Sequence, residues 1–279
     1  MRLDLMRRRA TVPARINIIG EHTDYSGGLS LPFAANYQLI LEANKRISGF
    51  SGDDTVIELW KAAGGWPADI IVNSSIPIGK GLSSSAALCV AVVLCSQGNQ
   101  DLLMIAKEAQ RIEHEVLGTP CGLLDQLAIL YAKKGHACLI DFSDLSVKLV
   151  PIPDNWIFKL VDSNIKRDLS MTDYGMDNNI LKNHVIDENS RVIDAIDSSP
   201  EELGELLEKS HYSLINLGIS LPEIDEQIES LKMVEGVLGA RMMGGGFGGM
   251  ILVLIDNPKV LPQYPIISSS DPAFLEEVL

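Results

Sequence analysis

The sequence predicts an α+β fold, in which helices and strands are mixed without the regular βαβ alternation of a doubly wound sheet. Three observations lead to this prediction. Strand-like runs dominate the beginning of the chain, apolar helices follow a Gly/Ser-rich loop at residues 79–85, and long amphipathic helices occupy the second half. Of the 279 residues, 46% are hydrophobic but only 5% are aromatic, so we expect a core built mainly from aliphatic side chains.

In the first half, alternating and apolar runs predict strands at residues 14–20, 29–34, 38–43 and 70–72, with a turn at residues 26–28. Gly64, Gly65 and Pro67 mark a break between the third and fourth strands. Helical patterns then follow at residues 86–96, 101–117 and 123–131. The second of these helices is expected to end at Gly118.

In the second half, strands are expected at residues 137–140 and 157–161, and Pro151 and Pro153 lie between them. This proline-containing stretch is the candidate domain boundary, which divides the chain into residues 1–153 and 154–279. Amphipathic helices are predicted at residues 176–196 and 200–217, and a further one is marked by apolar residues at 224, 228 and 231. A glycine-rich turn at residues 244–249 leads into a last strand at 250–255.

Net charge, the cysteine pattern and the length of apolar runs limit the expected partners and location of the protein. The formal net charge of −14 disfavours nucleic acids and anionic membranes, although Mg²⁺ and backbone amides can still hold phosphates in an acidic protein. The four cysteines form no C-x-x-C pair, and three of them, at residues 89, 95 and 138, lie in apolar runs typical of reduced buried thiols. With apolar runs too short to span a bilayer and no signal peptide pattern, we expect a cytoplasmic protein without membrane partners.

The strongest chemical signal is the segment at residues 77–87, with the sequence PIGKGLSSSAA. Glycines allow the backbone to approach a polyanion, and the helix that follows directs its free N–H groups at the loop. Serine hydroxyls can bind phosphate oxygens or Mg²⁺. A serine-rich N-cap of a core helix is an equally good interpretation from this stretch alone. The spacing does not fit a Walker A loop, because Lys80 is followed by glycine.

Three further signals are weaker when taken alone. Residues 244–249 fit G-x-G-x-x-G in letters, but they precede a strand instead of opening a helix, so a tight structural turn is the plainer interpretation. Glu21, His22 and Asp24 suit recognition of several hydroxyls, because carboxylates accept hydrogen bonds. The alternatives are a structural histidine and a turn-capping aspartate. Asp125 similarly fits an acid in the first turn of a helix.

Four segments in this order resemble the GHMP kinase superfamily, and in particular the galactokinases. Residues 15–25 (RINIIGEHTDY) resemble the galactokinase signature, and residues 77–87 resemble the second superfamily motif. Residues 118–126 (GTPCGLLDQ) resemble the galactokinase segment with the catalytic aspartate, and residues 241–249 (RMMGGGFGG) resemble the third superfamily motif. Weaker likenesses between them extend the resemblance over most of the chain.

The resemblance implies a two-domain architecture, with a ribosomal S5 domain 2-like N-terminal domain and a ferredoxin-like C-terminal domain. It also implies an ATP-dependent kinase acting on the anomeric hydroxyl of galactose or a close aldose, with ATP and Mg²⁺ as cofactors. Sugar and ATP would meet in the cleft between the domains. The partners would be small molecules only, and the chain would be a monomer or a weak dimer.

Site residues follow from the same resemblance. Asp125 would be catalytic, with Arg15 beside the reacting hydroxyl. Sugar contacts are expected from Glu21, His22, Asp24, Cys121, Gly122 and Tyr174. ATP contacts are expected from Gly79, Gly81, Leu82, Ser83, Ser84, Ser85, Ala86, Gly245 and Gly246. Mg²⁺ would be held by Glu113 and Ser85, while Glu115 would face away on the helix.

Several departures from the galactokinase pattern keep the substrate open. Three segments are shorter than in familiar galactokinases: residues 25–78, residues 175–243 and the tail after residue 255. The sequence also differs from the usual galactokinase sequence at residues 167–168 and 177–179. Arabinose, galacturonate or an amino sugar are therefore alternative substrates. A non-catalytic sugar sensor is a second hypothesis, but the serine loop and Asp125 are intact. A kinase of mevalonate or homoserine is a third, against which the acidic cluster at residues 21–24 argues.

Overall fold

The structure is a computed structural model, and it describes residues 6–165 and 178–278. Its helices and strands follow one another as β1 (Arg7–Asn17), β2 (Leu29–Ser30), β3 (Pro32–Lys45), α1 (Asp54–Ala62), β4 (Ala68–Ser74), α2 (Ser84–Gln97), α3 (Leu102–Ile112), η1 (Glu113–Leu117), α4 (Leu124–Leu130), β5 (His136–Asp141), β6 (Ser146–Pro151), β7 (Ile157–Asp162), α5 (Asn178–Ala195), α6 (Pro200–Asn216), α7 (Pro222–Lys232), β8 (Val237–Met242), β9 (Met250–Ile255), β10 (Ile266–Ile267) and β11 (Phe274–Val278).

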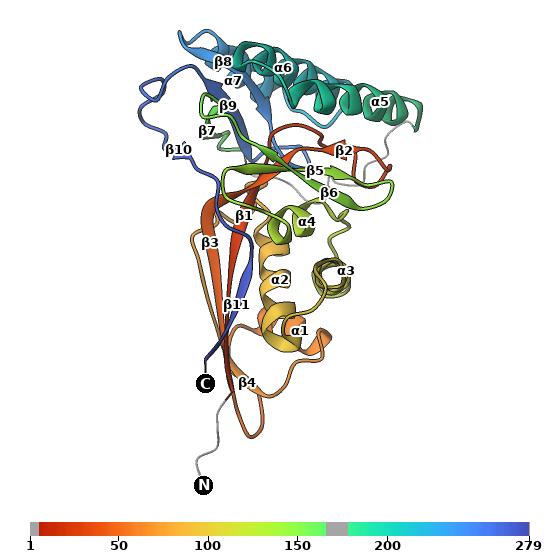
Figure 1. The fold of residues 1–279 in the computed structure, drawn as a ribbon, viewed down its shortest axis with the longest axis vertical. Coiled ribbons are helices and arrows are strands. Elements are labelled where there is room, and N and C mark those ends of the chain that lie inside the picture. Colours follow the sequence, from red (N-terminus) through yellow and green to blue (C-terminus); the bar gives the residue numbers. More distant parts are fainter. Residues whose placement is uncertain (1–5, 166–177, 279) are drawn as a thin grey trace.

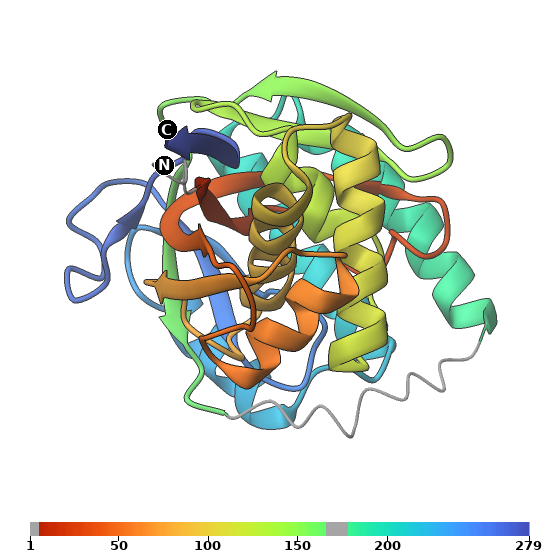
Figure 2. The ribbon, with the colours of Figure 1, turned by 90° about the horizontal axis from the view of Figure 1, so that it is seen from below.

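One antiparallel sheet, in the order β11-β1-β3-β4, carries the helices α1 to α4 on one face (Figures 1 and 2). The second sheet, in the order β10-β7-β9-β8, is covered by α6 and α7, and α5 packs beside α6 (Figure 1). A small sheet, β2-β5-β6, lies between these two parts. The mixture of antiparallel sheets and separate helical layers confirms the predicted α+β class.

The helix ends follow local chemistry. Asp53 and Asp101 cap α1 and α3, each accepting two backbone N–H groups, and Ser199 with Glu202 forms a capping box at α6. The α2 helix is buried almost all round, with Ala, Val, Leu and Cys side chains packed against β1 and β3. These buried side chains form the aliphatic core that the composition predicts.

Most predicted elements are present, and the differences have identifiable causes. The predicted strands at residues 29–34 and 38–43 are the short β2 and one long β3, because β3 continues through an irregularity opposite Pro13 and Ala14. The predicted helix at residues 101–117 changes from α to π geometry at Glu113. The elements α1, β6, β8, β10 and β11 were not predicted, since they are short or lack a clear apolar period. The first two residues of the predicted helix at 176–196 lie outside the described residues.

The described residues form two hydrophobic clusters, of which the larger spans both halves of the chain and the smaller lies within the second half. Phe33 of β3 stacks on Phe158 of β7, with ring centroids 6.0 Å apart, and both belong to one buried cluster. The last strand, β11, returns to pair with β1. The division into residues 1–153 and 154–279 therefore stays a prediction, and β11 crosses it.

Among the described residues, no single helix is long and apolar enough to cross a membrane. In this part of the chain, only α2 and residues 102–117 together have the length and apolar composition of a membrane-spanning segment, and the two are bent by 116° relative to each other.

Candidate active site

A cavity of about 970 Å³ lies where β1, the loop after it, the loop before α2, η1, α4 and the glycine-rich loop after β8 meet. Its lining contains most of the residues that the sequence singled out: Arg15, Glu21, His22, Asp24, Gly79, Gly81, Ser83, Ser84, Ser85, Glu113, Cys121, Gly122, Asp125 and Gly245. Segments far apart in the chain therefore share one site, as the resemblance implied.

Three predicted ATP contacts do not line this cavity. The side chains of Leu82 and Ala86 are buried in the core at 1% exposure, and Gly246 is buried against Ile219. Because these residues face the core, they support the loops, and a contact with ATP through their backbone stays a prediction. The predicted sugar contact Tyr174 lies outside the described residues.

The loop before α2 has the geometry of an anion site. Gly79 and Gly81 both have positive φ, and Ser83, at the N-cap position of α2, is left-handed with φ 62°. The Ser83 side chain makes no cap hydrogen bond, and its buried Oγ has no partner among the described residues. The serine-rich N-cap interpretation therefore fails here. The helix N–H groups and the Ser83 hydroxyl are instead available to an anion.

The two glycine-rich loops touch each other through backbone. A Cβ on Gly81 would lie 3.1 Å from the carbonyl oxygen of Met243, and one on Gly249 would lie 2.9 Å from that of Lys80. The backbone N–H of Met250 also donates to the Lys80 carbonyl at 3.1 Å. This close approach explains why glycines recur in both loops, and it gives the loop at residues 244–249 a structural role.

Arg15 connects the proposed catalytic aspartate, Asp125, to the Gly/Ser-rich loop at residues 79–85, the proposed phosphate loop. Its Nη2 lies 2.7 Å from Asp125 Oδ1, and its Nη1 donates to the carbonyl of Gly81. Arg15 is buried on β1, whereas the Asp125 side chain is 25% exposed at the start of α4. A carboxylate held by an arginine thus faces the cavity at the edge of the phosphate loop.

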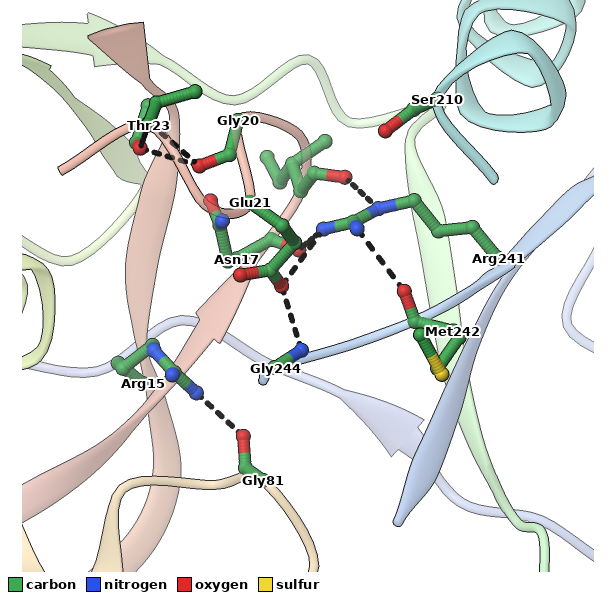
Figure 3. A network of polar contacts seen from close by, with 12 residues as sticks. Arg15, Asn17, Gly20, Glu21, Thr23, Gly81, Ser210, Arg241, Met242 and Gly244 are labelled. Carbon is green, nitrogen blue, oxygen red and sulfur yellow. Dashed lines mark hydrogen bonds and ion pairs between the residues drawn. The ribbon is translucent and has the colours of Figure 1, made fainter. Parts of the chain in front are cut away.

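Glu21 lies in the loop between β1 and β2, residues 18–28, called the signature loop below. It joins this loop to the glycine-rich loop after β8 (Figure 3). Its Oε1 accepts the Gly244 N–H at 2.7 Å and lies 3.2 Å from Nη2 of the fully buried Arg241. Arg241 also donates to the backbone carbonyls of Asn17 and Ile18. Burial raises the pKa of Glu21, but Arg241, Arg15 and the Gly244 N–H outweigh it and hold that pKa below its usual value.

The Asp24 side chain packs directly against Gly122, and both residues line the cavity. A Cβ on Gly122 would lie 1.9 Å from Asp24 Oδ2, so no side chain fits there. Burial, followed by the nearby charges of Asp125 and Glu21, raises the pKa of Asp24 to about 6. His22, in the same loop, has positive φ and pairs its Nδ1 with the Tyr25 hydroxyl at 2.8 Å.

Glu113 has the environment of a carboxylate that a cation would stabilise. It is 2% exposed, and Gln126 Nε2 donates to it at 2.9 Å. Burial and, to a lesser extent, the charge of Asp125 together raise its pKa to about 7, despite a hydrogen bond from Ser85. No three His, Cys, Asp or Glu side chains gather as a metal site in the described ranges. Glu113 and Ser85 fit Mg²⁺, which takes one or two protein ligands and completes its shell with phosphates and water.

The π-helix η1 orients two neighbouring side chains toward the site. Glu113 and His114 line the cavity, whereas Glu115 is exposed, as predicted, and pairs with Arg111. His114 Nε2 accepts the backbone N–H of Cys121 at 3.0 Å, which fixes the loop before α4. No role was predicted for His114, and its adjacency to Glu113 was the available signal. Single π turns often occur at functional sites.

Helix α5 supplies supports that the sequence did not reveal. His184 Nε2 lies 2.9 Å from the carbonyl oxygen of Glu21, and the fully buried Glu188 accepts the Gly20 N–H at 2.9 Å. Asn189 Oδ1 accepts the Leu29 N–H at 2.7 Å. These polar side chains recur on one face of a helix, and only the tertiary contact identifies them as anchors of the signature loop.

Comparison with known proteins agrees with this arrangement. Residues 7–45 match the galactokinase galactose-binding signature, residues 50–133 the GHMP kinases N terminal domain, and residues 192–263 the GHMP kinases C terminal domain. A galactokinase of Thermotoga maritima is 35% identical, over 88% of this chain and 89% of that relative. That alignment spans 310 positions, more than the 279 residues here, so the relative has segments that this chain lacks.

Solved structures agree on the fold. A Lactococcus lactis galactokinase complexed with galactose has a TM-score of 0.82 at 23% identity, covering 96% of this chain and 95% of that one. A Methanococcus jannaschii mevalonate kinase has a TM-score of 0.71 at 18% identity and covers both chains fully. The order of the matched segments, their convergence on one cavity and the Thermotoga relative lead to one conclusion. The chain belongs to the galactokinase family of the GHMP kinases.

Proposed function

We propose that this protein transfers the γ-phosphate of ATP to the anomeric hydroxyl of galactose. The observation that carries the proposal is the Arg15–Asp125 pair, which lies in the same cavity as the rest of the signature segment and the proposed phosphate loop. The Thermotoga maritima relative is named as a galactokinase, and the Lactococcus lactis structure contains galactose. The activity and the bound sugar are those of the two related proteins, and they support galactose as the first substrate to test.

Asp125 would orient the anomeric hydroxyl and accept its proton. Phosphoryl transfer requires a positioned nucleophile and compensation of charge more than covalent catalysis. The Arg15 guanidinium, 2.7 Å from Asp125, would lie beside the same hydroxyl and offset negative charge on the migrating group. Arg15 Nη1 donates a hydrogen bond to the Gly81 carbonyl, so the guanidinium is already oriented beside the proposed phosphate loop.

The sugar would be held by the signature loop and the loop before α4. Asp24 would accept hydrogen bonds from secondary hydroxyls, Glu21 and His22 would bind further hydroxyls, and Cys121 and Gly122 would line the pocket by backbone. Because Glu21 Oε1 already serves Gly244 and Arg241, its sugar contact would use the other oxygen. Tyr174, outside the described residues, is a further proposed contact.

ATP would bind with its phosphates at Gly79, Gly81 and the three serines at the N-terminus of α2, where the helix N–H groups favour anions. Gly245 would close the phosphate end. Glu113 and Ser85 would hold Mg²⁺, which neutralises charge on the phosphates when bound. We further propose a cytoplasmic enzyme that is a monomer or a weak dimer, with no nucleic-acid or membrane partner.

The test is an ADP-release assay with MgATP against a panel of aldoses, with the product identified by NMR. Galactose should give a 1-phosphate. Turnover only on arabinose, galacturonate or an amino sugar would keep the chemistry and change the substrate. Sugar and ATP binding without any turnover would instead support a sensor.

Asp125→Asn tests the mechanism in the same assay. We expect kcat to fall by about a hundredfold or more, because the proton acceptor is lost, while galactose still binds. Near-wild-type turnover with galactose binding retained would contradict the role of Asp125.

A further inference from the structure

Lys80 holds an unusual position in the phosphate loop. It lies between Gly79 and Gly81, both of which have positive φ, and it lines the active-site cavity. Its Nζ forms an ion pair with Asp162 Oδ1 at 2.7 Å. Asp162 ends β7 and is not among the residues that line the cavity. The pair therefore connects the phosphate loop to a carboxylate outside the site.

The charge balance of the cavity makes this lysine important. Four carboxylic acids line it, at Glu21, Asp24, Glu113 and Asp125, and among the described lining residues the only arginine or lysine side chains are Arg15 and Lys80. Arg15 is already engaged by Asp125 and the Gly81 carbonyl. A triphosphate entering this acidic cavity would find Lys80 as the remaining cationic side chain, apart from any metal ion that accompanies it.

Stability does not explain the ion pair. The side chains of Lys80 and Asp162 are 25% and 35% exposed, and ion pairs open to solvent contribute little to folding. Burial raises the pKa of Asp162, but its hydrogen bond with Lys80 and that from the Asn164 N–H keep the pKa below its usual value. The aspartate is thus a charged partner that a more highly charged group could replace.

We propose that Lys80 is a ligand of the ATP triphosphate, and that its side chain leaves Asp162 when the nucleotide binds. The proposal rests on the proposed function, which places ATP phosphates in this loop. The Lys80 backbone is fixed by the Met250 N–H and by close contact with Gly249, so only the flexible side chain has to move. A triphosphate carries several negative charges and attracts an ammonium more strongly than one exposed carboxylate does.

The experiment measures MgATP dissociation constants by calorimetry for the wild type, Lys80→Met and Asp162→Asn. Lys80→Met keeps the aliphatic stem and should weaken MgATP binding about tenfold or more, the loss expected for one charge-assisted hydrogen bond. The loss should be smaller for AMP, and galactose affinity should stay within about twofold of the wild type. Lys107→Met removes the same charge from an exposed position on α3 and should change neither affinity.

Asp162→Asn distinguishes a role of Lys80 as a phosphate ligand from a purely structural role of its ion pair. Asparagine keeps the oxygen that accepts the Asn164 N–H, but it removes the charge that competes for Lys80. MgATP should therefore bind as tightly as in the wild type or more tightly. Equal weakening of ATP binding or equal loss of thermal stability in Lys80→Met and Asp162→Asn would overturn the proposal. So would an unchanged MgATP affinity in Lys80→Met.

Because the readout is binding, the result is independent of turnover. A wild-type protein that binds MgATP but phosphorylates no aldose would contradict the proposed function and leave the Lys80 test intact. A wild-type protein that phosphorylates galactose, with a Lys80→Met variant of unchanged ATP affinity, would contradict only the role of Lys80.

Discussion

Asp24 makes the proposed sugar site sensitive to pH. Its carboxylate faces the cavity beside Gly122, and burial together with the charges of Asp125 and Glu21 raises its pKa to about 6. A protonated carboxyl accepts fewer hydrogen bonds from sugar hydroxyls than a carboxylate does. The same raised pKa also means that Asp24 favours folding below its usual pKa of 3.8 and loses this contribution as the pH rises through about 6.

We therefore expect galactose affinity to weaken as the pH falls below about 6, where the pKa of Asp24 lies. In Asp125→Asn one repelling charge is gone, so the pKa of Asp24 falls and binding should persist to lower pH. Calorimetric titration of galactose between about pH 5 and pH 8 measures both curves. Asp24→Asn serves as control and should lack this acidic transition. Superimposable pH profiles for wild type and Asp125→Asn would contradict the coupling.

Gly122 leaves space for Asp24, and a methyl group there should disturb the sugar site selectively. In Gly122→Ala the Cβ would lie 1.9 Å from Asp24 Oδ2 and 2.3 Å from its Cγ, so the carboxylate must move. We expect kcat/KM for galactose to fall on the order of a hundredfold, as misplacement of a positioning group does. The MgATP dissociation constant should stay unchanged.

Gly64→Ala is the matched control, because Gly64 has positive φ but no heavy atom within 4 Å of the point where a Cβ would lie. It should reduce stability by about 1–2 kcal/mol through backbone strain without changing kcat/KM. An equal loss of activity in both variants would show that Gly122 acts through general destabilisation.

At the scale of elements, η1 places one acid in the cavity and another in solvent. Glu113 begins η1 and is buried, whereas Glu115, two residues later, is exposed. Burial raises the pKa of Glu113 from 4.5 to about 7, so its protonated form is favoured in the folded protein. Its contribution to stability is present below about pH 4.5 and is lost as the pH rises through about 7.

Mg²⁺ should bind to the deprotonated form of Glu113 and release a proton. We expect the MgATP-dependent rate at limiting Mg²⁺ to fall as the pH drops below about 7, where the pKa of Glu113 lies. Glu113→Gln should raise the Mg²⁺ concentration needed for half-maximal rate and remove this pH dependence. The matched control, Glu115→Gln, should behave like the wild type. A Mg²⁺ requirement unchanged by Glu113→Gln would exclude this residue as the ligand.

At the scale of the whole molecule, the two sheets share the larger of two hydrophobic clusters, and the second sheet also contributes to the smaller one. Phe33 and Phe158 stack between β3 and β7, and β11 closes the edge of the first sheet beside β1. Parts that share buried apolar surface should unfold together. Substrates that bind between the signature loop and the glycine-rich loop should stabilise this joint unit.

Calorimetry should therefore show a single unfolding transition. Phe158→Ala, at a side chain only 2% exposed, should lower the free energy of unfolding by about 3–5 kcal/mol and lower the melting temperature of the whole chain. Two separate transitions in the wild type, with only one of them moved by Phe158→Ala, would favour independent domains at residues 1–153 and 154–279.

The sequence itself was sufficient for the family, the fold class and the chemistry of the four motifs. Short signals such as PIGKGLSSSAA and GTPCGLLDQ combine residue type with spacing, and helix and strand periods are local properties of the chain. The resemblance to galactokinases predicted Asp125, Arg15 and Glu113 as site residues, and all three line one cavity. The order of the motifs could identify the family because it does not depend on how the segments pack.

Only the tertiary structure showed which groups meet. Arg15 with Asp125, Glu21 with Arg241 and Lys80 with Asp162 join residues from different elements. Such pairs have no local period, and they depend on strand register and on how loops pack across the core. Burial, which the sequence does not state, raises the pKa values of Asp24 and Glu113. The sequence thus determined which chemical groups are present, and packing decided their partners and charge states, because those depend on distance and solvent exclusion.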